Sequence, residues 1–131
     1  MTKPKGKDEI REFDELAVWQ KSHSLLLSLY DDVNTFPEGE RFVLRSQLLR
    51  AAGSISANIA EGFGRFSYQE NIRFLQIARG SLAETRNHLL VARDLGYLPD
   101  SRYNQLAKEI KTIGILINGT IKSTKQQLKK V

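Results

Sequence analysis

Hydrophobic residues recur at alternating spacings of three and four in four separate runs along the chain. This spacing places them on one face of an α-helix, because a helix turns once every 3.6 residues. No run alternates with a period of two between turn residues, as a half-buried strand does. The connections between runs are short, which favours antiparallel neighbours. The pattern therefore predicts an all-α fold, an up-down antiparallel four-helix bundle.

The first two runs have recognisable ends. The first begins after Asp14, and its predicted core stripe is Leu16, Trp19, His23, Leu26, Tyr30 and Val33. It must end near Phe36, because Pro37 disfavours helical geometry in the residue before it. The second begins near residue 40, with a core stripe of Leu48, Ala52, Ile55 and Ile59. We expect it to end at Gly62 in the left-handed conformation that glycine adopts readily.

The last two runs are longer. Ser67 and Glu70 have the spacing of a capping box, which opens the third helix. Its core stripe continues to Gly96 through Leu75, Ala78, Leu82, Thr85, Leu89 and Ala92. A new cap is expected at Asp100 or Ser101, after Pro99. The fourth stripe comprises Tyr103, Leu106, Ile110, Ile113, Ile117 and Ile121, with fraying expected near the C-terminal lysines.

A chain of 131 residues fits one domain. We divide it into an N-terminal tail of mixed charge (1–12), the bundle (13–121) and a basic C-terminal end (122–131). The sequence has no cysteine, which excludes disulfides and thiolate metal sites and fits a reducing compartment. No window approaches about 18 uninterrupted apolar residues. A cytoplasmic location is therefore expected.

The net charge of +5 is concentrated at the two ends of the chain. Residues 1–7 hold three lysines and residues 122–131 hold four, with no acid in either segment. The rest of the chain carries 13 basic and 15 acidic residues. Total charge alone is therefore weak evidence for a phosphate-binding face.

Three arginines repeat at seven-residue intervals beside the third core stripe. Arg79, Arg86 and Arg93 would form one line about 21 Å long. They can pair with acids at the bundle edge, or they can bind phosphate or an acidic partner. We combine them with the C-terminal lysines as the candidate surface for nucleic acid or an acidic partner: Arg79, Arg86, Arg93, Lys122, Lys125, Lys129 and Lys130.

Some apolar residues fall outside the predicted core stripes. They can be ordinary exposed side chains, or they can bury against other subunits, because large apolar patches mark interfaces. We predict an oligomer interface that includes Val18, Leu25, Leu29, Phe74, Ile77 and Val91. Periodicity does not supply the number of subunits.

A polar line runs beside the second core stripe. Ser54, Asn58 and Glu61 are predicted to form an interhelical hydrogen-bond network with Arg50 or Arg65. The glycine-containing turn that follows, residues 62–67, precedes a helix N-terminus and could bind an anion through Arg65. It matches neither dinucleotide nor Walker spacing, so a cap and turn is the favoured interpretation.

Catalytic chemistry has little support. The only histidines, His23 and His88, lie on different helices, and the paired Glu-x-x-His pattern of di-iron bundles is missing. Ser54 and Ser56 lie inside a helix without a nucleophile elbow. We therefore expect no metal, no cofactor and no enzymatic activity.

The sequence resembles the four-helix-bundle family named for proteins encoded in intervening sequences of bacterial 23S ribosomal RNA genes. The likeness runs from Phe13 to about Ile121 and rests on five motifs: FDELAVWQ at 13–20, Phe36-Pro37 with Glu40, the 47–65 stretch with Asn58-Ile-Ala-Glu-Gly62, FLQIARGSLAET at 74–85, and Leu95-Gly-Tyr97. Gly53 departs from the larger side chain usual in that family. The resemblance implies a homopentamer and no established enzymatic activity.

A more distant similarity is to the accessory protein of diversity-generating retroelements. That protein is also a pentameric bundle, and it associates with a reverse transcriptase and with nucleic acid. The expected function is thus a non-enzymatic oligomeric bundle that binds RNA, other nucleic acid or a nucleic-acid-handling protein. The alternative is a protein–protein interaction scaffold with no direct nucleic-acid contact, and no membrane role is expected.

Overall fold

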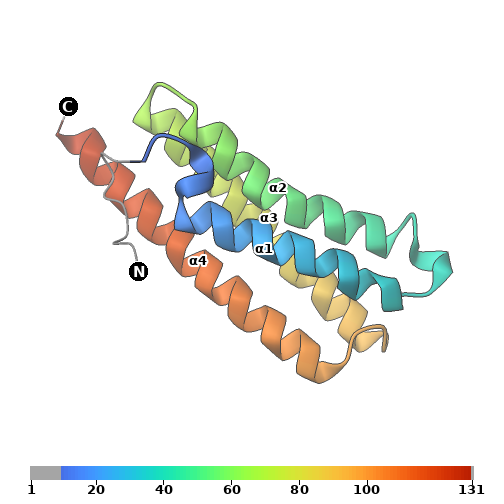
Figure 1. Ribbon diagram of the computed structural model, residues 1–131. Coiled ribbons are helices and arrows are strands. Elements are labelled where there is room, and N and C mark those ends of the chain that lie inside the picture. The colour runs from blue at the N-terminus through green and yellow to red at the C-terminus, as the bar shows by residue number, and fades with distance from the viewer. Residues whose placement is uncertain (1–9, 131) are drawn as a thin grey trace.

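The computed structural model of the protein describes residues 10–130 (Figure 1). It contains four long helices: α1 (Ala17–Asp32), α2 (Leu44–Phe63), α3 (Tyr68–Asp94) and α4 (Asp100–Lys129). Short 3₁₀ turns lie at Phe13–Glu15, Val33–Thr35 and Glu38–Glu40. No strand is present in this part of the chain. The all-helical prediction is therefore confirmed.

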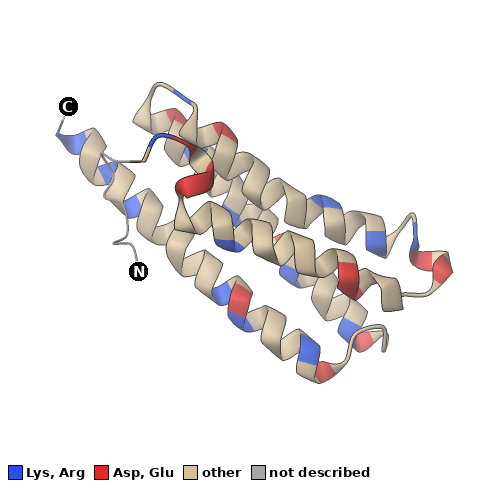
Figure 2. Cartoon of the chain, viewed as in Figure 1, with Lys and Arg blue, Asp and Glu red and all other residues tan. Residues whose placement is uncertain are grey.

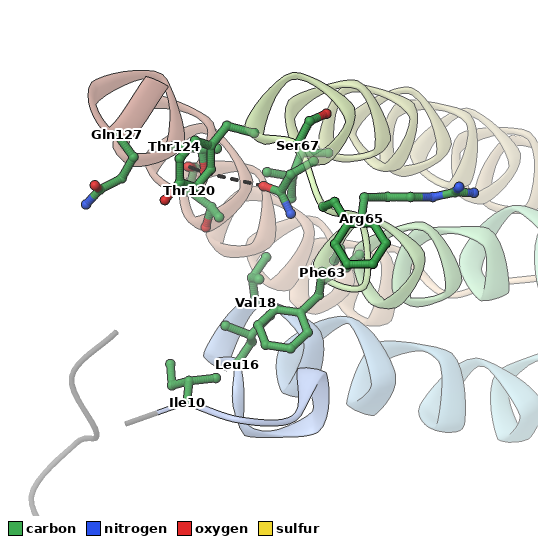
Figure 3. A pocket seen from close by; sticks show the side chains of 14 residues that line it. Ile10, Leu16, Val18, Phe63, Arg65, Ser67, Thr120, Thr124 and Gln127 are labelled. Carbon is green, nitrogen blue, oxygen red and sulfur yellow. Dashed lines mark hydrogen bonds between the residues drawn. The ribbon is translucent and has the colours of Figure 1, made fainter. Parts of the chain in front are cut away.

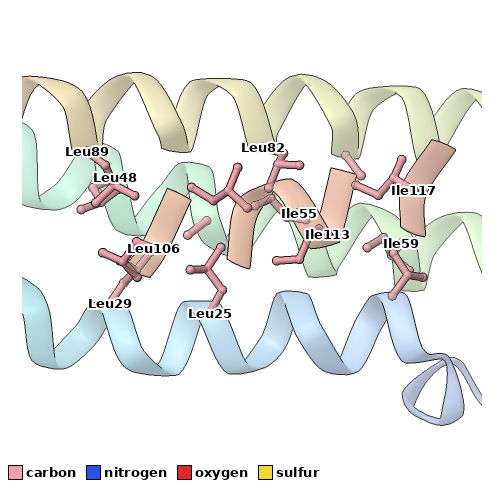
Figure 4. Close-up of a cluster of buried hydrophobic side chains, with 14 of the residues drawn as sticks. Leu25, Leu29, Leu48, Ile55, Ile59, Leu82, Leu89, Leu106, Ile113 and Ile117 are labelled. Carbon is pink, nitrogen blue, oxygen red and sulfur yellow. The ribbon is translucent and has the colours of Figure 1, made fainter. Parts of the chain in front are cut away.

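The four helices lie lengthwise around one apolar core. The main contacts join α2 with α3, α3 with α4, α1 with α2, and α1 with α4. Figure 4 shows the core side chains meeting from all four helices, among them Leu25, Leu48, Leu89 and Leu106. Every residue of the predicted α2, α3 and α4 stripes is buried. Three of the four helices therefore follow their sequence periodicity.

The predicted core stripe of α1 is only partly correct. Val33 is buried, and Leu16, Trp19 and Leu26 pack partly buried against the core. Val18, Leu25 and Leu29 are buried to 4%, 2% and 0% exposure, together with Ser22. Tyr30, from the predicted stripe, is 54% exposed. Both stripes have helical spacing, so periodicity could not separate them. The stripe that contains the small Ser22 packs inward, where a compact side chain lets helices approach.

This correction removes half of the predicted oligomer interface. Because Val18, Leu25 and Leu29 belong to the core of a single chain, they are not free to contact another subunit. The neighbouring stripe of α1 is partly buried, and its Leu26 lies near Gly53 of α2. There Trp19 stacks on His23 with ring centroids 4.6 Å apart, and Phe13 meets Trp19 edge-on at 5.3 Å.

The turn between α2 and α3 differs from its prediction. Gly62 is helical, and Gly64 follows at φ −81°. A Cβ atom on Gly62 would lie 2.8 Å from Phe74 Cβ, so this glycine is needed because α2 and α3 approach closely. The freed carbonyl of Gly62 accepts a hydrogen bond from Asn71 Nδ2 at 2.8 Å. Asn71 therefore caps the end of α2 from α3.

The predicted side-chain cap is present at the start of α3 and is not found at the start of α4. Ser67 Oγ accepts a hydrogen bond from the Glu70 amide at 3.1 Å, as the capping-box spacing predicts. Gly96 at φ 80° is the only residue with positive φ in the described range, and it ends α3. The N-cap of α4 is Pro99, without a side-chain cap. The helix then continues unbroken past residue 121, so that position is no structural boundary.

The predicted N-terminal tail lies mostly outside the described residues, which begin at Ile10. Within residues 10–130, none of the helices is both long and apolar enough to cross a membrane.

Candidate nucleic-acid interface

The basic side chains of α3 and α4 meet along the line where these helices pack. Arg79 Nη1 donates a hydrogen bond to Asn118 Oδ1 at 3.0 Å, which ties the α3 arginine line to α4. Arg86 is exposed further along α3, and no ion pair restrains it among the described residues. The guanidinium groups of these two arginines therefore remain available to an anion.

Two open hollows follow this helix pair. One, of about 370 Å³, is lined by Arg79, Asn118, Ile121, Lys122, Lys125, Gln126 and Lys129. The other, of about 410 Å³, is lined by Arg79, Leu82, Ala83, Arg86, Asn87, Leu90 and Ile110. Neither lining contains an acidic residue. We call the surface over both hollows the α3–α4 basic face.

The composition of α4 makes this face basic. Residues 110–130 contain no Asp or Glu, whereas Lys122, Lys125, Lys129 and Lys130 are all exposed. In Figure 2 the lysines appear as blue bands near the C-terminal end of the helix. Helical spacing turns Lys122, Lys125 and Lys129 toward the α3 side, and Lys130 is not among the lining residues. The lysines of residues 122–130 thus give the α3–α4 pair a locally cationic surface, although residues 8–121 are slightly acidic.

Arg93 is bound differently from the other two arginines of its line. Its Nε and Nη2 lie 3.0 Å from Asp94 Oδ1, and its guanidinium lies 4.6 Å from the centre of the Tyr103 ring. These contacts hold Arg93 at the far end of the α3–α4 pair. It is therefore a structural residue in this arrangement, separate from the two basic hollows.

The predicted polar network divides into two parts. Ser54 Oγ accepts hydrogen bonds of 2.9 Å from Asn58 Nδ2 and from Ser81 Oγ, so Ser54 links α2 to α3. Glu61 instead pairs at 2.6 Å with Arg65, which lies in the turn just after the end of α2. Arg50 is exposed and joins neither part. Sequence reasoning missed Ser81, which is buried on α3 but lies outside the predicted core stripe.

The apolar residues predicted to face outward on α3 differ in exposure. Ile77 is 40% exposed and Val91 is 39% exposed. Phe74 is half-buried beneath Arg65, whose guanidinium lies 4.8 Å from the ring centre. The surface also exposes Leu27 on α1 and Ile115 on α4. These side chains remain available for contact with another molecule.

An ion pair fixes the end of the bundle opposite the lysines. Arg102 Nε and Nη2 donate to the two carboxylate oxygens of Asp32 at 2.8 and 2.9 Å. This hydrogen bond raises the pKa of Arg102 above its ordinary value, although desolvation opposes the shift. The pair joins α1 to α4 and has no ligand-binding geometry of its own.

The described residues hold no group of three or more His, Asp or Glu side chains that could ligate a metal ion. His88 lies beside Glu84, with Nε2 and Oε1 3.4 Å apart. His23 lies against Trp19 on α1. The two histidines thus lie on different helices, α1 and α3, and have different neighbours.

Residues 14–119 match the family described as 23S rRNA-intervening sequence protein. A solved structure with TM-score 0.75 and 27% identity is described as a protein of unknown function from the S23 ribosomal protein family of Bacteroides thetaiotaomicron. The similarity covers 81% of this chain and 99% of that one. No curated protein matches the chain.

Proposed function

Because the chain belongs to the 23S rRNA-intervening sequence protein family, we propose that it is a non-enzymatic RNA-binding protein of the cytoplasm. The α3–α4 basic face is its binding surface. The observation that carries the proposal is the convergence of Arg79 with Lys122, Lys125 and Lys129 in one hollow without an acid. The family name, which refers to a ribosomal RNA, supports the same choice of polyanion.

The form of the face suits a nucleic-acid backbone. Its cations come from two adjacent helices and follow a line, as phosphates do along a strand. Each phosphate that a cation neutralises releases condensed counterions, which gives RNA binding its steep dependence on salt. Because these lysines and arginines are exposed, salt screens their attraction to phosphate, and their contacts should be reversible.

The proposal includes an up-down antiparallel order of helices and a homopentameric assembly. Short connections and the contacts of α1 with both α2 and α4 support the order. The exposed Ile77, Val91 and Leu27 support self-association, and the number five follows the family resemblance. Five copies would present five basic faces. One RNA bound to several of them would release more counterions than an RNA bound to a single chain. Light scattering should give five times the 14.9 kDa chain mass.

A protein–protein scaffold is the second candidate. Its support is the exposed apolar side of α1, which includes Leu27 and Tyr30 at 55% and 54% exposure. A partner held there would stay bound at moderate salt and after nuclease treatment. A partner held through RNA would be released by nuclease.

The test is binding of a fluorescent single-stranded RNA as a function of salt concentration. We expect log Kd to change steeply and linearly with log salt, with a slope of about 0.7 per phosphate contacted. The double variant Arg79→Gln/Lys125→Gln should bind more weakly at low salt and should lower the slope by about 1.4. Absence of binding at low salt, or binding that ignores salt, contradicts the proposal.

A matched control has the same loss of charge elsewhere. Arg41→Gln/Arg50→Gln removes two exposed cations that lie before and within α2. This variant has the same net charge as the first, so it should retain most of the affinity if the α3–α4 basic face is the site. Equal losses in the two variants would show that RNA responds to overall charge and not to this face.

A further inference from the structure

A pocket of about 350 Å³ lies at the end of the bundle where α2 passes into α3, and it is separate from the α3–α4 basic face. Figure 3 shows Leu16 just before α1, Val18 of α1, Phe63 of α2, and Thr120 and Thr124 of α4 around it. Its volume falls within the range of about 300–1,000 Å³ typical of small-molecule sites. The sequence did not predict this cavity, although Arg65 of the 62–67 turn lines it.

The lining combines an apolar interior with aromatic side chains at the α2–α3 turn. Ile59, Phe63 and Leu75 line it together with Phe66 and Tyr68. Phe66 is fully exposed at 109% and Tyr68 is 43% exposed. Because the ring of Phe66 is exposed, a flat base can stack on it without displacing another side chain of the protein. This is the arrangement by which proteins hold unpaired bases.

The pocket also has a polar side on α4. Thr124 Oγ1 donates to the Thr120 carbonyl at 2.8 Å and lies 3.4 Å from Asn71 Oδ1. Asn71 Nδ2 is used by the Gly62 carbonyl. Gln127 lines the same side and is half-buried. Its side-chain amide makes no hydrogen bond to another described residue. One free amide, with a donor and an acceptor, therefore remains for the edge of a base.

The same stretch of α4 lines both this pocket and the basic face. Thr120, Thr124 and Gln127 face the pocket, whereas Lys122, Lys125 and Lys129 face α3 on the other flank. A helix with its side chains is about 10–12 Å across, a width that a few nucleotides of single strand cover. A backbone bound by the lysines can thus reach across α4 with one base at the pocket.

We propose that this pocket binds one unpaired nucleobase of an RNA strand, stacked on Phe66 and hydrogen-bonded by Gln127, while the neighbouring lysines hold the strand's phosphates. The proposal rests on the proposed function and specifies it: the ligand is single-stranded RNA, and duplex RNA engages the basic face alone. A duplex keeps its bases stacked and paired, so it cannot place one in the pocket.

The experiment compares variants on single-stranded and duplex RNA with the same number of phosphates. Phe66→Ala should weaken single-strand binding about tenfold, the scale of one base–aromatic stack, and leave duplex binding unchanged. Gln127→Ala should act in the same direction and should also reduce discrimination among bases. The control is Phe42→Ala, because Phe42 is 83% exposed and follows Arg41 as Phe66 follows Arg65. It should change neither affinity.

A second measurement separates this proposal from RNA binding by the basic face. Ligand-observed NMR with adenosine 5′-monophosphate should show base protons in contact with the wild-type protein and not with Phe66→Ala. If the variants bind single strands and duplexes like the wild type, and the nucleotide shows no contact, the pocket proposal is wrong and RNA binding by the basic face still stands. If no RNA binds but the nucleotide contact depends on Phe66, the proposed function fails and the base pocket remains.

Discussion

Arg102 on α4 donates hydrogen bonds to both carboxylate oxygens of Asp32 on α1, with N···O distances of 2.8 and 2.9 Å. The two residues are 70 positions apart, and their side chains are 29% and 13% exposed. They join the last turn of one helix to the first turn of another. The bundle thus has a polar clamp at the end opposite its candidate base pocket.

Breaking this clamp should lower stability. Arg102→Ala leaves the Asp32 carboxylate without its bidentate partner, and we expect the free energy of unfolding to fall by about 1–3 kcal/mol in urea titrations. Because the carboxylate of Asp32 raises the pKa of Arg102 above its ordinary value, the stability that this shift contributes is lost only when the pH rises into the strongly alkaline range where the guanidinium deprotonates. The exposed pair Arg73–Glu70 is the control. Arg73→Ala should cost less than about 0.5 kcal/mol, and equal costs would contradict the clamp.

Two glycines of α2 should respond in opposite ways to alanine. A Cβ on Gly62 would lie 2.8 Å from Phe74 Cβ, whereas one on Gly53 would lie 4.0 Å from the nearest atoms of Leu26. Gly62→Ala forces α2 and α3 apart and should cost about 1–3 kcal/mol. Gly53→Ala gains helix propensity and should add about 0.5–1 kcal/mol. Thermal denaturation of the two variants tests both signs.

The burial of Leu25 in the core stripe of α1 can be measured directly, with the exposed Leu27 as the control. Leu25 is 2% exposed and Leu27 is 55% exposed, so Leu25→Ala should destabilise the protein by about 2–5 kcal/mol. Leu27→Ala should change its stability by about 0.5 kcal/mol or less in the isolated chain. If Leu27→Ala lowers the stability strongly, but only at protein concentrations at which subunits associate, then Leu27 lies in a subunit interface.

The Ser54–Ser81 hydrogen bond should couple α2 to α3. Ser54→Ala removes the acceptor of both Asn58 and Ser81, and we expect a loss of about 1–2 kcal/mol. Ser81→Ala leaves the Asn58 contact intact and should cost less. A double-mutant cycle on chemical denaturation should give a coupling of about 0.5–1.5 kcal/mol. A coupling near zero would mean that the two hydroxyls act independently.

Local sequence signals predicted much of this architecture. The stripes of α2, α3 and α4 were selected correctly, because the apolar residues outside them, such as Ile77 and Val91 on α3, are too far apart to form a second stripe. Ser67 with Glu70 marked the start of α3, because a capping box depends on a spacing of three residues and on nothing distant. The arginine spacing on α3 likewise placed Arg79 and Arg86 on one side of the helix.

Other features depended on contacts between helices. The face of α1 was ambiguous because two apolar stripes share its surface, and only packing against α2 and α4 selects Val18, Leu25 and Leu29. Gly62 looked like a C-terminal glycine, but its requirement comes from Phe74 across the turn. The base pocket joins side chains as distant as Leu16 and Gln127, a proximity that no spacing along the chain encodes.

The sequence by itself determined the helical fold, the positions of the turns and the concentration of positive charge in the C-terminal segment. These properties follow from local backbone preferences and from the 3.6-residue period. Only the tertiary structure decided which side of α1 is buried, which arginines stay free, and how Arg79 joins the lysines of α4. The physical reason is that burial and charge neighbourhoods arise between helices, and their side chains meet only when the bundle is packed.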